Sequence, residues 1–170
     1  AEAVETVLGS PNTASKRWVY RQYDHEVQIR TAMRPGDDAA ILAIRDGKTG
    51  AAADSRSGDE GETTHGTGLA LAAGTDPNWT DSAPYEGAWA TGLENATNLA
   101  AKGATPLAAV DCLNAGNPEK PEVYGEFKAI VEGLSDVCKS LSVPVVGGNV
   151  SLYNDSETGP IPPTPTVTMG

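Results

Sequence analysis

The sequence predicts an α+β fold, with a mixed, mostly antiparallel sheet of four to six strands and two long helices on one face. The first observation is the order of the segments, which reads as strands, helix, strand, helix and two further strands. The second is that only two of these segments have the length and periodicity of a long helix. With 170 residues the chain suits one domain, 1–170, with a substantial core.

The N-terminal part predicts short elements. A helix over 2–8 is expected to stop at Gly9, and Ser15 is a candidate N-cap for a second short helix. Apolar residues alternate at period two over 26–33, which indicates a strand, and the continuous apolar run 39–45 indicates a buried one.

A polar loop is expected at 46–67, because Gly, Ser, Asp and Glu dominate there and large apolar residues are almost absent. His65 lies in this loop. A single histidine in such a setting is far more often a surface residue than a ligand.

Two long helices and four strands follow. Small apolar residues recur at helical spacing over 84–102, and Gly103 is expected to end that helix at the C′ position. The second helix, over 123–141, has one apolar face. No helix remains to cover the other face of the sheet, which should therefore be buried against another domain or subunit. The remaining strands are expected at 68–73, 107–110, 143–146 and 161–169.

The formal net charge of −11, from 23 acids and 12 bases, argues against a nucleic-acid-binding surface. The acids are spread over the chain and lysines are few, which favours adaptation to a salty cytoplasm over an ordinary acidic surface. No apolar run is long enough to cross a membrane, and the N-terminus does not resemble a secretory signal. Cys112 and Cys138 lack zinc-ligand spacing, so a reduced, cytoplasmic setting is expected.

Two polar runs follow apolar segments and are the candidate binding regions. In the first, Asp111, Asn114 and Asn117 are expected at the end of a strand, where α/β and α+β sheets place ligands. A carboxylate there can bind Mg²⁺, orient a nucleotide hydroxyl or act as a base, but it can equally cap a turn. One carboxylate with an asparagine suits Mg²⁺.

In the second run, Gly147 and Gly148 follow the strand 143–146. Glycines allow backbone N–H groups to approach a ligand closely, although a Gly-Gly pair can also mark a β-bulge. Asn149 and Ser151 are expected to project together from one face.

Tyr23, Asp24 and His25 precede a predicted strand. His25 is the one credible general base, against the simpler reading of a histidine hydrogen-bonded at a strand start. The sequence has no phosphate-binding Gly-Lys-Ser/Thr loop, no nucleophile elbow and no Cys–His pair of the amidotransferase kind.

Five stretches resemble, in order and nearly end to end, the large synthetase subunit of phosphoribosylformylglycinamidine synthase, which belongs with aminoimidazole ribonucleotide synthetase. They are 15–28 (SKRWVYRQYDHEVQ), 98–107 (NLAAKGATPL), 111–123 (DCLNAGNPEKPEV), 146–154 (VGGNVSLYN) and 161–165 (IPPTP). The resemblance is to the N-terminal sheet domain of the second of two repeats. It implies a sheet that pairs with a sister domain into a barrel, with nucleotide in the cleft.

The resemblance also implies an activity. The family converts formylglycinamide ribonucleotide into the amidine, using ATP, Mg²⁺ and ammonia from glutamine. The implied partners are the remaining domains of the synthetase, a glutaminase subunit and a small accessory subunit, and a homodimer of the isolated domain is a further option. Two alternatives remain open. One is a non-catalytic pairing domain with a structural nucleotide site. The other is a different superfamily member, such as thiamine-phosphate kinase or selenophosphate synthetase, whose acid-rich N-terminal motifs are not seen here.

Carried over position by position, the resemblance implies that Asp111 and Gly148 contact the nucleotide, Asn149 binds Mg²⁺ and Ser151 contacts the substrate. No catalytic residue is expected, because the family's catalytic histidines lie in the first repeat. The sequence departs from the family pattern at Ala115, where an aromatic residue is usual, at 74–84, and in the 46–67 loop, which looks like an insertion.

Overall fold

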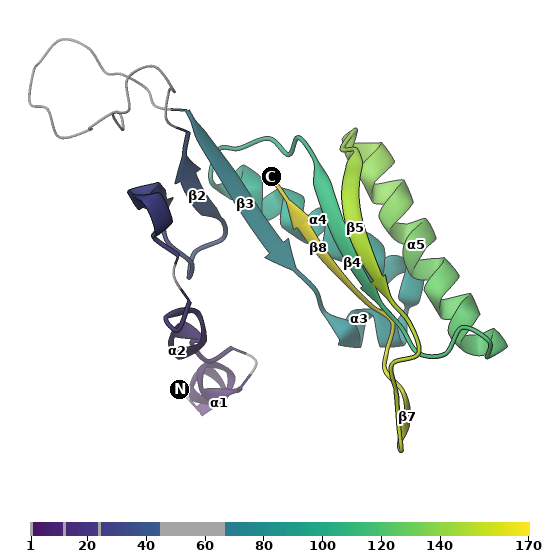
Figure 1. Ribbon diagram of the computed structural model, residues 1–170. Coiled ribbons are helices and arrows are strands. Elements are labelled where there is room, and N and C mark those ends of the chain that lie inside the picture. Colours follow the sequence, from purple (N-terminus) through teal and green to yellow (C-terminus); the bar gives the residue numbers. More distant parts are fainter. Residues whose placement is uncertain (1, 12, 24, 45–66) are drawn as a thin grey trace, which may run out of the picture. The chain divides into compact units, whose positions relative to one another are not determined.

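The computed structural model describes residues 2–11, 13–23, 25–44 and 67–170 (Figure 1). They belong to two compact units, Ala1–Gly68 and Leu69–Gly170. Asp24, His65 and the predicted polar loop up to residue 66 lie outside the described residues.

The first unit contains short elements only. These are α1 (Glu2–Gly9), α2 (Arg17–Tyr20), the 3₁₀ turn η1 (Val27–Ile29), β1 (Thr31–Met33) and β2 (Ala40–Ala43). β1 and β2 pair antiparallel. The strand predicted over 26–33 is wrong in its first half, because Gln28 and Ile29 have φ values of 60° and 52°, which break an extended chain.

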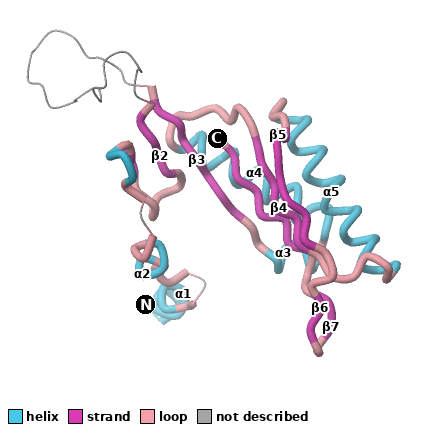
Figure 2. Tube along the Cα trace, in the orientation of Figure 1, coloured by secondary structure: helices cyan, strands magenta, loops and turns pink. Residues whose placement is uncertain are grey.

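The second unit is a mixed sheet with two long helices. Its elements are β3 (Gly68–Gly74), α3 (Pro77–Ser82), α4 (Pro84–Ala101), β4 (Ala109–Asn114), α5 (Pro121–Leu141), β5 (Val145–Ser151), β6 (Asp155–Ser156), β7 (Gly159–Pro160) and β8 (Thr164–Met169). The order of the main strands is β3-β8-β4-β5; Figure 1 labels all four, and Figure 2 draws them in magenta. β8 is antiparallel to both of its neighbours, whereas β4 and β5 are parallel and joined through α5. The predicted α+β class and mostly antiparallel sheet are confirmed.

Both long helices lie on one face of this sheet (Figure 1). Alternate residues of β4 and β8 point to that face and are buried, including Leu113, Val167 and Met169. α4 ends as predicted, since Gly103 follows it with a φ of 74°.

Glycines bring α4 and α5 together. A Cβ added at Gly92 would lie 2.5 Å from Cγ1 of Val137, and one at Gly133 would lie 2.2 Å from the carbonyl oxygen of Tyr85. The small residues predicted on α4 therefore allow α5, as well as the sheet, to approach α4 closely. The distance between the two helices is set by one glycine from each.

The opposite face of the sheet carries apolar side chains at one end. A hollow of about 250 Å³ opens there, beside the C-terminal residue Gly170. Leu69 and Leu107 are exposed at its rim. This part of the prediction, an uncovered face with apolar surface, is confirmed for the second unit. Leu71, Val110 and Val146 also line the hollow.

α3 is an element that the sequence analysis did not include. It begins where Asp76 accepts a hydrogen bond from the backbone N–H of Asn78 at 2.9 Å, and Pro77 is its first residue. An aspartate N-cap followed by proline is an ordinary helix-start signal, so the sequence did contain the information.

Candidate functional site

The candidate site lies on the parallel pair β4 and β5, not in a strand-to-helix turn as expected. β4 runs from Ala109 to Asn114, so Asp111 and Asn114 are strand residues and only Asn117 lies in the turn that follows. The strand predicted over 107–110 begins two residues later and continues through Asn114. Asn114 lies on the uncovered face of β4, which accepts polar side chains, whereas Asp111 lies on the face that the helices cover.

Asp111 and Gly148 face each other across this pair. A Cβ added at Gly148 would lie 2.1 Å from Oδ1 of Asp111 and 2.8 Å from its carbonyl oxygen. Glycine is thus required at position 148, because the Asp111 carboxylate occupies the space that a Cβ would need. The two residues that the resemblance assigns to one nucleotide are therefore adjacent in the sheet, and their contact with a nucleotide stays a prediction.

Asp111 points to the helix-covered face, like its strand neighbour Leu113. Partial burial raises the pKa of the Asp111 carboxyl. Burial, followed by the negative charge of Asp111, raises the pKa of the Cys138 thiol in α5. No hydrogen bond or ion pair from the described part of the chain holds the Asp111 carboxylate. Among the described residues this partly buried carboxyl has no hydrogen-bond or ion-pair partner, which makes it a candidate ligand-binding position.

We expect Asp111→Asn to stabilise the fold at pH 7 by a few tenths of a kcal/mol, with water screening keeping the gain small. The folded-state pKa lies above the ordinary value of 3.8, so ionisation opposes folding. The gain should vanish well below pH 3.8, where the carboxyl is protonated in both states, and grow as pH rises through the folded-state pKa. Urea unfolding at pH 3 and pH 7 measures it, with exposed Glu126→Gln as the control. Lower stability of Asp111→Asn at pH 7 would contradict this account.

Asn149 and Ser151 lie on the opposite face of the same strands. Asn149 is paired with Cys112, at 4.0 Å between Nδ2 and Sγ, and Ser151 is paired with Asn114. Their predicted projection from one face is consistent with this register. The four predicted residues are therefore neighbours along β4 and β5, but they divide two and two between the faces of the sheet.

The glycine pair also marks a β-bulge, the alternative considered from sequence. Ala109 pairs with Val145, and Val110 pairs with Gly147, so Val146 is the extra residue. The two interpretations are compatible, because the bulge sets the register that brings Gly148 opposite Asp111.

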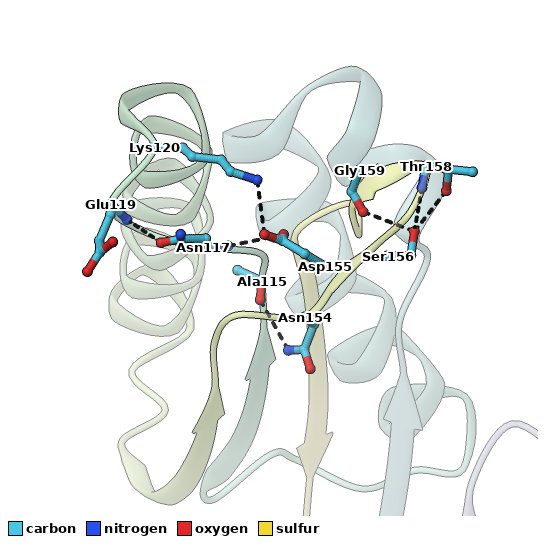
Figure 3. Close-up of polar contacts among 9 residues, drawn as sticks. All are labelled: Ala115, Asn117, Glu119, Lys120, Asn154, Asp155, Ser156, Thr158 and Gly159. Atoms are coloured by element: carbon cyan, nitrogen blue, oxygen red, sulfur yellow. Dashed lines mark hydrogen bonds and ion pairs between the residues drawn. The ribbon is translucent and has the colours of Figure 1, made fainter.

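The turns after β4 and β5 are tied together by side chains that sequence reasoning gave no role (Figure 3). Asp155 accepts hydrogen bonds from the backbone N–H of Asn117 at 3.3 Å and from Nζ of Lys120 at 2.9 Å. Nδ2 of Asn154 donates to the carbonyl oxygen of Ala115 at 3.1 Å. We call Asn154, Asp155 and Lys120 the loop clamp.

The loop clamp also orients Ser151. Nδ2 of Asn154 lies 3.1 Å from Oγ of Ser151 and donates to its carbonyl oxygen at 2.9 Å. Asn154 belongs to the stretch 146–154 quoted above. An asparagine just after a strand is an ordinary turn signal, but which groups it would join could not be read from the sequence.

A metal ion would find few ligands here. The described residues contain no group of three or more His, Cys, Asp or Glu side chains placed to hold one. Asn149 and Asp111 lie on different faces of the sheet, so Asp111 adds no ligand beside Asn149. On its own face, the amide of Asn149 offers one neutral oxygen. Mg²⁺ retains waters and binds substrate phosphates, so a single protein oxygen from this chain fits it when phosphates and other domains supply the rest.

His25 belongs to the first unit. Its Nδ1 lies 3.1 Å from the carbonyl oxygen of Tyr23. This contact matches the simpler of the two readings made from sequence, a histidine hydrogen-bonded near a strand start.

Comparisons with known proteins agree with this architecture. Residues 36–170 match the family model described as AIR synthase related protein, N-terminal domain. The chain is 69% identical over 168 residues to phosphoribosylformylglycinamidine synthase subunit PurL of Halorubrum lacusprofundi and 67% identical to that of Haloarcula marismortui. Each match covers 99% of this chain but only 22% and 21% of the relative.

Solved structures give the same picture. PurLQS from Thermotoga maritima matches with a TM-score of 0.74 and 31% identity, over 92% of this chain and 23% of that one. T. maritima PurL complexed with ATP and with FGAR matches with a TM-score of 0.71 in each case, at 30% and 31% identity, over 92% of this chain and 23% and 22% of theirs.

Among the described residues, none of the helices has the length and apolar character needed to span a membrane. By its match over 36–170, the chain belongs to the AIR synthase related protein, N-terminal domain family.

Proposed function

We propose that this chain is the N-terminal sheet domain of the second repeat of a PurL-type phosphoribosylformylglycinamidine synthase, acting in the cytoplasm. The observation that carries the proposal is the 69% identity to a PurL subunit over 168 residues. The chain spans about a fifth of the curated relatives it matches, so catalysis would need other domains. The ligase would convert formylglycinamide ribonucleotide into the amidine with ATP and ammonia from glutamine.

Within that enzyme, the residues of β4 and β5 would bind and orient ligands. Asp111 and Gly148 would contact ATP, Asn149 would supply an oxygen to Mg²⁺, and Ser151 would contact the ribonucleotide. Bound Mg²⁺ would neutralise charge on the phosphoryl group. β5 is the last strand of the order β3-β8-β4-β5. Ligands that contact residues on both faces of the sheet would therefore have to meet around the outer edge of β5.

The uncovered face would pair with a sister domain into a barrel. The apolar hollow beside Gly170 supports this, because exposed leucines at its rim cost free energy unless another surface covers them. Residues 1–170 would then act as one domain of a larger assembly. A glutaminase subunit and a small accessory subunit would be the partners, in line with the PurLQS structure.

A chimera tests the assignment. This chain would replace the matching segment of the Halorubrum lacusprofundi subunit, and formation of the amidine would be measured with ammonia as nitrogen donor. We expect an active chimera, with the KM for ATP raised at least about tenfold by Asp111→Ala and the KM for formylglycinamide ribonucleotide raised by Ser151→Ala. Asn149→Ala should raise the Mg²⁺ requirement. The isolated chain should not hydrolyse ATP.

The second candidate function, a pairing domain with a structural nucleotide site, predicts a different result. In that case the chimera would be active, but all three variants would have the same turnover and KM values as the parent. ATP hydrolysis by the isolated chain would contradict both candidates.

A further inference from the structure

The first unit contains a second candidate binding site, built from residues that have no part in the function proposed above. A cavity of about 630 Å³ opens there, within the size range of small-molecule sites. Its lining is rich in cationic and aromatic side chains: Arg17, Tyr20, Arg21, Tyr23, His25 and Arg34. We call this cavity the arginine pocket.

The arginines are concentrated against the trend of the whole molecule. The chain has 12 lysines and arginines and a formal net charge of −11, yet three arginines line this one cavity. Among the described lining residues one is acidic, Glu26, and it forms an ion pair with Arg34. The described lining therefore carries an excess of positive charge in a chain that is acidic as a whole.

Two of the arginines are available to a ligand. Arg17 opens α2 and Arg21 follows its last residue, with the backbone N–H of Arg21 donating to the carbonyl oxygen of Arg17 at 3.1 Å. Residues four apart lie on the same side of a helical turn. Within the described part of the chain, no carboxylate pairs with either guanidinium.

The wall of the pocket is held by specific contacts. Tyr20 and His25 pack edge to face, with ring centroids 6.4 Å apart. The Thr31 hydroxyl donates to the carbonyl oxygen of His25. Gly36, with a φ of 112°, lets the chain pass Tyr20, since a Cβ there would lie 2.8 Å from the Tyr20 hydroxyl oxygen. These contacts fix aromatic rings and a phenol donor in the same lining as the guanidinium groups of Arg17 and Arg21.

From this arrangement we infer that the arginine pocket binds the phosphate group of a small phosphate ester. Guanidinium forks match phosphate oxygens in a bidentate geometry, and two of them balance the charge of a phosphate monoester. The cavity is larger than one phosphate needs. The ring of Tyr23, 71% exposed, offers the rest of the ligand a surface to pack on.

The test is a titration of the 170-residue chain with ribose 5-phosphate, AMP and inorganic phosphate, with adenosine as the phosphate-free control. The readout is the NMR chemical shift of the imidazole protons, which is simple to follow because the chain has only two histidines. We expect both esters to shift one imidazole and adenosine to leave it unchanged. Arg17→Gln with Arg21→Gln should weaken binding at least about tenfold. Arg30→Gln, the same change outside the pocket, should leave it unaltered.

Three results would overturn the inference: no phosphate compound binds, the double variant binds as well as the parent, or Asp111→Asn abolishes the signal and so assigns it to the ATP site proposed above. If inorganic phosphate binds as tightly as the esters, phosphate recognition stands and the ester part of the inference is overturned. Far-UV circular dichroism of each variant excludes unfolding as the cause of lost binding. Since none of the pocket residues contributes to the proposed ATP contacts, the two proposals can fail separately.

Discussion

Gly133→Ala should destabilise the second unit by about 2 kcal/mol or more, because the added methyl group has no space in the interface between α4 and α5. It would lie 2.2 Å from the carbonyl oxygen of Tyr85 and 3.3 Å from the Cβ of Ala88. The nearer obstacle is backbone, which cannot rotate away like a side chain. The two helices would have to move apart, with loss of packing along their length. Urea unfolding followed by circular dichroism measures the change.

The same helix provides a matched control. Gly125 also lies in α5, but a Cβ added there meets no atom within 4 Å. Gly125→Ala should therefore stabilise the chain by about 0.5–1 kcal/mol, as alanine favours helix over glycine. Equal effects from the two substitutions would refute the close approach of α4 and α5.

Gly148→Ala is expected to weaken ATP binding by about tenfold or more in the chimera, if Asp111 contacts the nucleotide as proposed. The methyl group would occupy the space of the Asp111 carboxylate, 2.1 Å from Oδ1, and would press on its carbonyl oxygen at 2.8 Å. The carboxylate must then rotate away or the two strands must separate. The KM for ATP and equilibrium binding of ATP report the effect.

Gly147→Ala is the corresponding control, because the nearest atom to its Cβ would be Cγ1 of Val110 at 3.9 Å, an ordinary contact. It lies one residue earlier on β5 and on the other face. We expect it to keep the KM for ATP within about twofold of the parent. If both alanines weakened binding alike, strand flexibility rather than the Asp111–Gly148 contact would be responsible.

Long periodic elements could be predicted from the sequence. α5 was expected over 123–141 and runs from Pro121 to Leu141, because a single apolar face repeated over several turns has few interpretations. The end of α4 was predicted for an equally local reason, since Gly103 adopts a positive φ.

The failures were local conformations that periodicity does not report. Val27, Ile29, Thr31 and Met33 alternate like a strand, yet Ile29 is 85% exposed and has a positive φ. In β4 the strand continues through Asp111, because pairing with β5 and β8 decides where a strand ends. Such long-range pairing is not encoded in any short window of sequence.

For the candidate site, composition and spacing identified two polar runs that lie on neighbouring strands, but not the orientation of their side chains. That Asp111 and Asn149 point to different faces depends on the bulge at Val146, which shifts the register by one residue. The residues that join the two turns, such as Asp155, were also unpredictable, since their partners are 35 to 38 positions away.

The loop clamp has a consequence for the ionic conditions that the chain tolerates. PurL subunits of halophilic archaea are among its relatives. In molar salt the screening length falls to about 3 Å, so the partly exposed pair between Lys120 and Asp155 contributes little there. The bonds of the Asn154 amide to the carbonyl oxygens of Ala115 and Ser151 join neutral dipoles, which dissolved ions hardly weaken. The orientation of Ser151 thus depends on contacts that change little with salt concentration.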